Sequence, residues 1–396
     1  EGVGTWKVGV GNWNDAGVNR AWANGKYAIF GGGTAGTAGT ITLGGNITPG
    51  SMTFNAPNAG TYTIDLNGYT LSVPTSYGSI NGTSPTVIKD TLGTGALVMQ
   101  AGNEIFNSTD LSIEAKITGG YDVRAINKQL ILSNNLNDFT GYVGVQWTGP
   151  LTLLSIKNSG VSSAAGAGSE IRVGNFASLK YIGSGDTHNR TLTLYGAGTL
   201  SVASEGTGPL VFTGSIVNNN NVTFSLQGAN TGANEIQSVL ANNGANVLTL
   251  QKNGTGTWVL SGVNTFTGDL DIFGGTLRLG GAGQLGSGNY ASPDSIFIGA
   301  GAAFDFSSSA NQTLGTIIGT GALTVNGPGI LTLSGNNTYS GATTINNGGK
   351  LKAGSTTALS VNSTFSVGAG GTLDLAGYNN TIKDLTAGTA TSVITD

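Results

Sequence analysis

Few side chains in this sequence of 396 residues have the type and spacing that catalysis requires. His188 is the only histidine, and it lies two residues after Asp186, so the pair could supply the base and the orienting acid of a Ser–His–Asp arrangement. A separation of two residues would demand unusual local geometry, and no Gly-x-Ser-x-Gly nucleophile elbow is present in the sequence. We therefore expect His188 to be a polar turn residue.

Two carboxylates are the other candidates for acid–base chemistry. Asp269 and Asp271 alternate along a predicted strand, so both side chains point to the same face. Glycosidases use paired carboxylates as general acid and as base or nucleophile. The residues 73 positions later are Ala342 and Thr344, which permits a local specialisation without requiring one. We assign no catalytic residue and expect a protein that is not an enzyme, with a carbohydrate-active site as the alternative.

Metal and cofactor sites are not expected either. The chain has no cysteine, which excludes thiolate zinc sites and iron–sulfur clusters. Its glycine-rich turns lack the aspartate that calcium-binding nonapeptide repeats carry in every coil. Residues 281–286 satisfy G-x-G-x-x-G by letter, but no helix is predicted after them, so they are interpreted as a loop. Asp305 and Asp374 recur at one repeat position, as expected for a structural turn or cap.

The composition narrows the class of protein. Glycine accounts for 68 residues, whereas Lys, Arg, Asp and Glu total only 36, with a net charge of −4. Dispersed cations in an acidic chain exclude a nucleic-acid binder. A hydrophobic content of 38% argues against intrinsic disorder, and the glycines lack the collagen period. After these exclusions, the composition indicates an ordered protein that is rich in glycine-containing turns.

The elements that must position these residues are short strands. Apolar and polar residues alternate over four to six positions and then stop at Gly, Asn or Asp, while helical periodicity is nearly absent. Pairs such as Asn67-Gly68 supply the positive φ of sharp corners. The clearest runs are Thr40–Leu43, Tyr62–Leu66, Thr191–Leu194, Trp258–Leu260 and Ile330–Leu333. The pattern predicts an all-β chain.

An internal repeat organises these strands. Residues 254–268 align with residues 327–341 at a constant offset of 73, and the similarity continues over 254–306 and 327–375. A weaker copy lies near 137–151. Units of a few short strands cannot bury an apolar face alone, so neighbouring units must stack.

Stacking of such units predicts a right-handed parallel β-helix of about 16 coils. One repeat period would correspond to three coils of about 24 residues each. Parallel stacking would also align Asn264-type positions into ladders of side-chain amides. Three uneven copies do not close a β-propeller. We expect one continuous solenoid, with N-terminal coils over 1–125 and the repeat-bearing part over 126–396.

The repeat residues carry a resemblance to a known family. Residues 254–268, followed by Gly275-Thr-Leu277, and the second copy from Gly335 onward resemble the autotransporter-associated β-strand repeat. This resemblance implies a secreted or surface-displayed parallel β-helix of a Gram-negative-type bacterium with an adhesive, matrix or structural role. The tryptophan-rich start (Trp6, Trp13, Trp22) is similar to the leading segment of these proteins, and we expect it to cap the helix, with anchoring of a partner as the alternative.

Together these observations predict a non-enzymatic extracellular protein that acts in adhesion or in building a biofilm matrix, with a polysaccharide-binding or polysaccharide-degrading β-helix as the alternative. Expected partners are other copies of the chain, associated end to end or laterally into filaments, and cell-surface glycans or proteins. No run of 18 apolar residues is present, so no transmembrane segment is expected. The first residues lack the features of a signal peptide, as expected for a mature chain.

Overall fold

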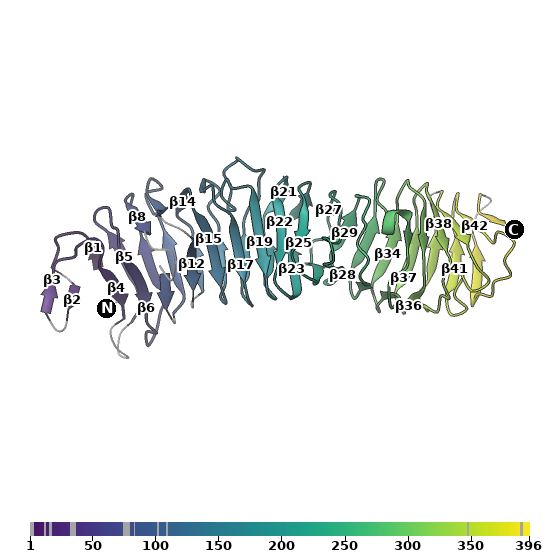
Figure 1. Ribbon diagram of the computed structural model, residues 1–396, viewed down its shortest axis with the longest axis horizontal. Coiled ribbons are helices and arrows are strands. Elements are labelled where there is room, and N and C mark those ends of the chain that lie inside the picture. The colour runs from purple at the N-terminus through teal and green to yellow at the C-terminus, as the bar shows by residue number, and fades with distance from the viewer. Residues whose placement is uncertain are drawn as a thin grey trace. The chain divides into compact units, whose positions relative to one another are not determined.

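The computed structural model describes residues 4–11, 13–15, 18–31, 37–73, 80–82, 84–100, 103–107, 110–346, 348–388 and 391–396. These residues form two compact units, Glu1–Leu192 (unit 1) and Thr193–Asp396 (unit 2). Each unit is a stack of short parallel strands, drawn side by side in Figure 1. In the described residues each unit is an all-β parallel solenoid, which confirms the predicted fold class. The single helical element in the described part is the 3₁₀ turn η1 (Gly286–Gly288).

Unit 1 contains three parallel sheets and one short antiparallel pair. Its first sheet has the strands β1 (Gly4–Trp6), β5 (Thr40–Leu43), β7 (Tyr62–Asp65), β10 (Thr86–Lys89), β13 (Leu111–Ile113), β16 (Leu130–Leu132), β18 (Pro150–Leu153) and β20 (Ser178–Tyr181). The second has β4 (Tyr27–Phe30), β6 (Ser51–Phe54), β9 (Ile80–Gly82), β12 (Asn103–Asn107), β15 (Asp122–Ile126), β17 (Val143–Gln146) and β19 (Glu170–Gly174). The third has β8 (Thr70–Val73), β11 (Ala96–Met99) and β14 (Lys116–Gly119). The antiparallel pair is β2 (Trp13–Asp15) with β3 (Val18–Arg20), and β21 (Ser184–His188) lies near the end of the unit.

Unit 2 also has three parallel sheets. The first has β23 (Gly198–Ser204), β26 (Val222–Gln227), β28 (Leu248–Lys252), β30 (Leu270–Ile272), β33 (Ile296–Ile298) and β36 (Ile317–Gly319). The second has β24 (Gly208–Phe212), β27 (Asn234–Ile236), β29 (Thr257–Leu260), β31 (Thr276–Leu279), β34 (Ala303–Phe306), β37 (Ala322–Val325), β39 (Thr343–Ile345), β41 (Thr364–Val367) and β43 (Asp384–Ala387). The third has β32 (Asn289–Tyr290), β35 (Gln312–Leu314), β38 (Ile330–Leu333), β40 (Lys350–Ala353), β42 (Thr372–Asp374) and β44 (Val393–Thr395). Two further strands are β22 (Thr191–Tyr195), which spans the boundary in sequence, and β25 (Ile216–Asn218).

Alternating apolar residues form the core of each unit. In unit 1 the register places Ile88, Ile113, Leu132 and Leu153 above one another on successive turns. All four side chains are fully buried. Because strand side chains alternate between faces, each column of inward residues is flanked by polar residues that face outward. The alternation seen in the sequence therefore sets both the register and the core.

The two strong repeat copies lie on different faces of unit 2. Thr257 pairs in register with Thr276, then Ala303, then Ala322, so three full turns of the second sheet end at Ala322. The equivalent of Thr257 in the second copy is Ile330, which lies further along the chain and begins β38 in the third sheet. The expectation that one repeat period makes three whole coils is therefore wrong. The period is longer than three turns, and the excess carries the second copy onto the next face.

The repeated asparagines do not stack on one another but clamp the backbone of neighbouring turns. Asn264 Oδ1 accepts a hydrogen bond from the backbone N–H of Leu240 on the preceding turn (2.9 Å). Its Nδ2 donates to the carbonyl oxygens of Gly262 (2.9 Å) and of Gln284 on the following turn (3.0 Å). The predicted amide ladder is therefore wrong at this position. Bonds to the backbone of the preceding and following turns recur at Asn137, Asn234 and Asn337.

The rest of the repeat motif follows from the same close packing. The aromatic residue two positions after the clamp, Phe266 or Tyr339, is fully buried. The glycine two positions later, Gly268 or Gly341, lies against backbone of the preceding turn, where a Cβ atom would overlap the carbonyl oxygen of Leu248 or Gly321. The sequence G-x-N-x-(F/Y)-x-G is thus the description of one tightly packed corner.

The tryptophans near the start form one aromatic cluster. The ring centroids of Trp6 and Trp22 are 5.0 Å apart, and those of Trp13 and Trp22 are 4.7 Å apart. Phe30 joins Trp6 at 5.4 Å and stacks on Phe54 at 4.8 Å. Trp6 and Trp22 are buried, so their rings extend the core of the first turns and are not exposed for a partner.

Candidate functional site

His188 and Asp186 do not form a catalytic pair. His188 is buried at the end of strand β21, where its Nδ1 accepts a hydrogen bond from the backbone N–H of Arg190 (3.3 Å). The expectation of a turn residue is wrong, because His188 alternates with the strand and faces inward. Burial, with the Arg190 charge, lowers the pKa of His188 to about 3, so the ring is neutral. Asp186 instead accepts bonds from Tyr181 Oη (3.1 Å) and from the Ile156 N–H (2.9 Å).

Arg190 is a buried cation that the sequence pattern did not single out. Its guanidinium donates to backbone carbonyl oxygens of the segment 157–168, which connects β18 to β19 without a strand of its own. The shortest bonds with normal geometry run from Nε to Lys157 O and from Nη2 to Gly166 O, both 2.7 Å. Five donors in a rigid fork suit this task, which holds a long connection in one shape. Arg190 is therefore used for structure and not for binding.

Lys252 is a second inward-facing cation, in unit 2. In the register it occupies a core column with Leu226 and Ile272. Its Nζ donates to the carbonyl oxygens of Asn253 (2.8 Å), Gly254 (3.0 Å) and Gly274 (3.0 Å). Burial lowers the pKa of Lys252 to about 8, because the charged form loses hydration.

This shift predicts a pH-dependent stability. Between pH 8 and 10 the unfolded state binds more protons at Lys252 than the folded state, so the free energy of unfolding of unit 2 should rise with pH by about 1–2 kcal/mol. The variant Lys252→Met should lack this rise. Hydrogen exchange of unit 2 peptides across this pH range measures it, with exposed Lys350→Met as the control. An equal rise in Lys252→Met would contradict the assignment.

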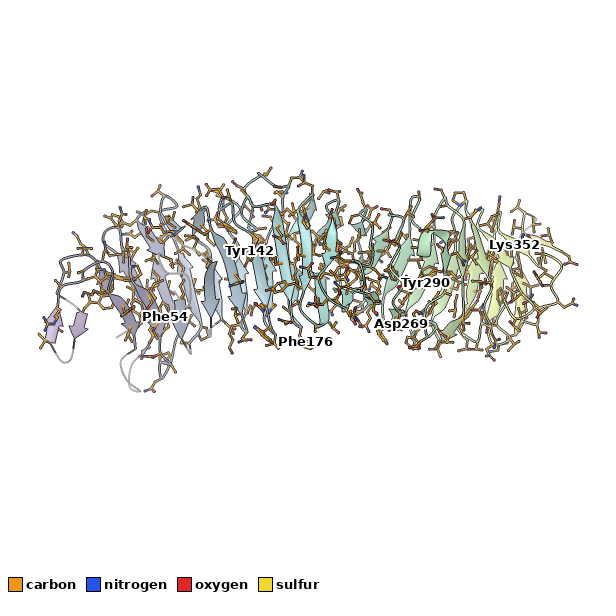
Figure 2. All side chains as sticks on the ribbon, in the orientation of Figure 1. Phe54, Tyr142, Phe176, Asp269, Tyr290 and Lys352 are labelled. Carbon is orange, nitrogen blue, oxygen red and sulfur yellow. The ribbon has the colours of Figure 1, made fainter. Side chains whose placement is uncertain are left out.

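The acid pair lies on the outer face of unit 2. Asp269 and Asp271 flank the buried Leu270 of β30, so both carboxyls face outward, and Asp271 is opposite Gln251 of β28. Asp269 Oδ1 accepts bonds from Ser292 Oγ and from the backbone N–H of Asp294, both 3.2 Å. We call Asp269, Asp271 and Asp294 the acidic face; Asp269 and nearby Tyr290 are labelled in Figure 2.

The acidic face contains one carboxyl group whose pKa is raised, which acid–base catalysis would use. Burial raises the pKa of the Asp271 carboxyl, and the negative charges of Asp269 and Asp294 add to the rise, while a hydrogen bond from Gln251 opposes it. A carboxyl with a raised pKa beside a second carboxyl is an arrangement that a general acid and its partner can use. Tyr290, which lies nearby, donates its hydroxyl to Gly268 O (2.6 Å) and so serves the fold. Across the described ranges no group of three or more His, Cys, Asp or Glu residues could hold a metal ion.

Two aromatic rings adjoin the acidic face. Phe297 of β33 is opposite Asp271 in the register, and its ring centroid lies 5.4 Å from that of Phe273. Phe273 is 47% exposed. Aromatic faces beside carboxylate and amide groups can bind a sugar ring, whose C–H face is apolar and whose edge carries hydroxyls.

The two repeated aspartates, Asp305 and Asp374, are not part of the acidic face. The Asp305 carboxylate accepts hydrogen bonds from Arg278 Nε (2.7 Å) and Ser307 Oγ (2.7 Å). Asp374 accepts from the Ala376 N–H (2.9 Å), which is a turn role.

Unit 1 carries a cluster of two arginines and a tyrosine on its second sheet. Arg124 Nη1 donates to Tyr142 Oη (3.0 Å), and the Arg172 guanidinium lies 3.9 Å from the centre of the Tyr142 ring. Glu170 pairs with Arg172 at 2.8 Å, and Asp122 accepts from the Tyr142 N–H (3.0 Å). The two arginines are balanced by Glu170 and Asp122, so the cluster has no net charge. We interpret it as a network of surface contacts on the sheet and not as an anion-binding site. Figure 2 labels Tyr142.

Comparison with known proteins places the repeats in context. Residues 250–279 and 323–353 match the family described as Passenger-associated-transport-repeat, and the offset between the two matches is that of the internal repeat. Over 146 residues, 35% of this chain, the sequence is 40% identical to the Adhesin BmaC autotransporter of Brucella suis biovar 1 (strain 1330). That stretch spans 4% of the relative's length. No solved structure matches the chain.

The predicted resemblance to autotransporter-associated repeat proteins is confirmed by these two comparisons. Among the described residues no helix is long and apolar enough to cross a membrane.

Proposed function

We propose that this chain is a non-enzymatic, adhesive part of a protein displayed on or secreted from a Gram-negative bacterium. The observation that carries the proposal is the 146-residue similarity to an autotransporter adhesin, joined to two matching transport repeats. The buried polar groups agree with it, because His188, Arg190 and Lys252 all serve the fold. The outer faces of the solenoid would then provide the adhesive surface.

Attachment can be measured directly with the purified chain. Beads coated with the folded protein should attach to epithelial cells more often than beads coated with the same protein after thermal unfolding. Equal attachment of the two preparations would contradict an adhesive surface that depends on the solenoid.

The acidic face with its two phenylalanines favours a second candidate, a β-helix that binds or cleaves polysaccharides. If it cleaves them, Asp271 would act as the general acid and Asp269 as the base or nucleophile. Asp269→Ala and Asp271→Ala should each reduce depolymerisation about 100-fold or more in a screen of soluble polysaccharides. Asp384→Ala is the matched control, because Asp384 is an exposed carboxylate of unit 2 that lies outside the acidic face. Unchanged products from both variants would remove these residues as a catalytic pair.

Self-association is a finer proposal within the adhesive function. Parallel solenoids can join end to end, because strands at a sheet edge offer unpaired N–H and C=O groups. Negative-stain microscopy of the purified chain at high concentration should then show filaments. A uniform population of short rods would overturn this part of the proposal and leave adhesion intact.

A further inference from the structure

One corner of unit 1 carries exposed aromatic residues in a backbone conformation that disfavours them. Strands β15, β17 and β19 end in register, with Ile126, Gln146 and Gly174 above one another. The next residues, Asn127, Trp147 and Asn175, all have positive φ (63°, 71° and 41°), and so does Phe176 (65°). The N–H of Asn127 bonds to Gln146 O (3.1 Å) and that of Trp147 to Gly174 O (3.2 Å), so the corners stack directly. We call Trp147 and Phe176 the corner aromatics.

Phe176 occupies a position where the same chain elsewhere uses glycine. Asn175-Phe176 forms a tight turn closed by the Ala177 N–H on Gly174 O (3.2 Å). Asn67-Gly68 forms an equivalent turn, with φ of 47° and 80° and a closing bond from Tyr69 to Leu66 (2.9 Å). The left-handed region is strained for a bulky residue and free of strain for glycine.

Burial of the two rings does little to offset this strain. Phe176 is 61% exposed and Trp147 is 46% exposed, so neither ring is part of the core. Figure 2 shows Phe176 at the outer edge of its unit. Strained residues that the fold does not need are concentrated at ligand-contact sites. Trp147 and Phe176 both have a positive φ, which is unfavourable for an aromatic residue, and both lie on neighbouring turns of one corner with their rings partly exposed to solvent.

The surroundings indicate which ligand chemistry fits. Exposed or half-buried polar side chains adjoin the two rings in sequence and across the stacked corner: Asn127, Lys128, Thr148 and Asn175. Two isolated rings offer far less apolar area than the buried centre of a stable protein interface needs. A sugar ring needs one aromatic face for its C–H side and polar groups for its hydroxyl edge.

We propose that the corner aromatics are a saccharide-binding site, on which a linear glycan lies across successive turns and stacks one ring on Trp147 and another on Phe176. The inference rests on the proposed adhesive function and gives it a ligand class. The site is separate from the acidic face, which belongs to unit 2.

The test uses the full chain and two variants. Phe176→Gly introduces the residue type of the equivalent Asn67-Gly68 turn, and Trp147→Asn introduces the residue type of the stacked positions 127 and 175. Isothermal titration calorimetry measures the binding of chitohexaose, cellohexaose and a hyaluronan octasaccharide to each protein, because a fluorescence readout would be lost with Trp147. We expect the wild-type chain to bind at least one of them, and each variant to bind it about tenfold more weakly or worse. Phe176→Gly should at the same time unfold at a temperature about 2 °C higher, because the strain is relieved.

Gly93→Phe is the matched control, since Gly93 has a φ of 74° and open space around it. That variant should lose thermal stability and keep wild-type saccharide binding. Absence of binding by the wild-type chain at millimolar saccharide, or undiminished binding by both variants, would overturn the proposal. Self-association that Phe176→Gly abolishes would overturn it in favour of a second copy. Cell attachment measured in parallel separates the two proposals, because attachment without saccharide binding contradicts only the site.

Discussion

Asn337→Ala should lower the free energy of unfolding of unit 2 by about 3–4 kcal/mol. The buried amide accepts from the Ile317 N–H (2.7 Å) and donates to the carbonyl oxygens of Gly335 (3.3 Å) and Ala358 (2.5 Å). Alanine would leave these buried backbone groups without a hydrogen-bond partner. Each unsatisfied group lowers the free energy of unfolding by about 1–3 kcal/mol. The loss should spread to the turns on both sides, because one side chain joins three of them.

The sequence supplies a matched control for this change. Asn336 is the preceding residue of the same motif and is exposed, and its equivalent in the other copy is Val263. Asn336→Ala should change stability by less than about 0.5 kcal/mol. Denaturant unfolding followed by hydrogen exchange of the peptides around Ile317 and Ala358 compares the two variants. Equal stability of Asn336→Ala and Asn337→Ala would show that the clamp contributes nothing.

Arg190→Met should destabilise unit 1 by about 3–5 kcal/mol and release the segment 157–168. Removing a buried charge recovers part of its lost hydration, and burial already lowers the pKa of Arg190 to about 10. This gain is smaller than the loss, because several carbonyl oxygens lose their donor at about 1 kcal/mol or more each. Limited proteolysis within 157–168 and denaturant unfolding report the two effects.

Two comparisons make the Arg190 result interpretable. Arg190→Lys should recover only a small part of the stability, because a single ammonium cannot replace the planar fork. Arg278→Met removes a half-exposed guanidinium that pairs at 2.7 Å with the buried carboxylate of Asp305. Asp305 keeps its hydrogen bonds from Ser307 and Asn326, so this change should cost only about 1–2 kcal/mol. Wild-type resistance of the 157–168 segment in Arg190→Met would contradict the clamp.

The fold class was predictable because strand alternation and stacking are local properties of the chain. Runs such as Thr40–Leu43 and Ile330–Leu333 are strands in the structure. The repeat offset was also visible, but the face on which each copy lies was not, since that depends on the length of every intervening turn. Turn lengths vary, as the spacings from Thr257 to Thr276 and from Thr276 to Ala303 illustrate.

The candidate sites were less predictable, because their properties depend on three-dimensional neighbours. The outward direction of Asp269 and Asp271 follows from strand alternation, whereas their approach to Ser292 and Asp294 requires the next turn. Arg190 and Lys252 gave no signal, since a cation in a β run is usually assigned to the solvent face. The sequence signal for the corner at Phe176 is the pair Asn-Phe, at a turn where Asn67-Gly68 has glycine.

The displacement of one repeat copy onto the next face has a consequence for biosynthesis. Duplicated sequences in a solenoid risk pairing with the wrong copy, since each strand of one copy is a competent partner for the neighbours of the other. In unit 2 the equivalent strands β29 and β38 belong to different sheets. If one strand took the place of the other, it would have to move by three turns and also pass from one sheet to the next. We expect this phase between the copies to disfavour misassembly of the repeats in the nascent chain.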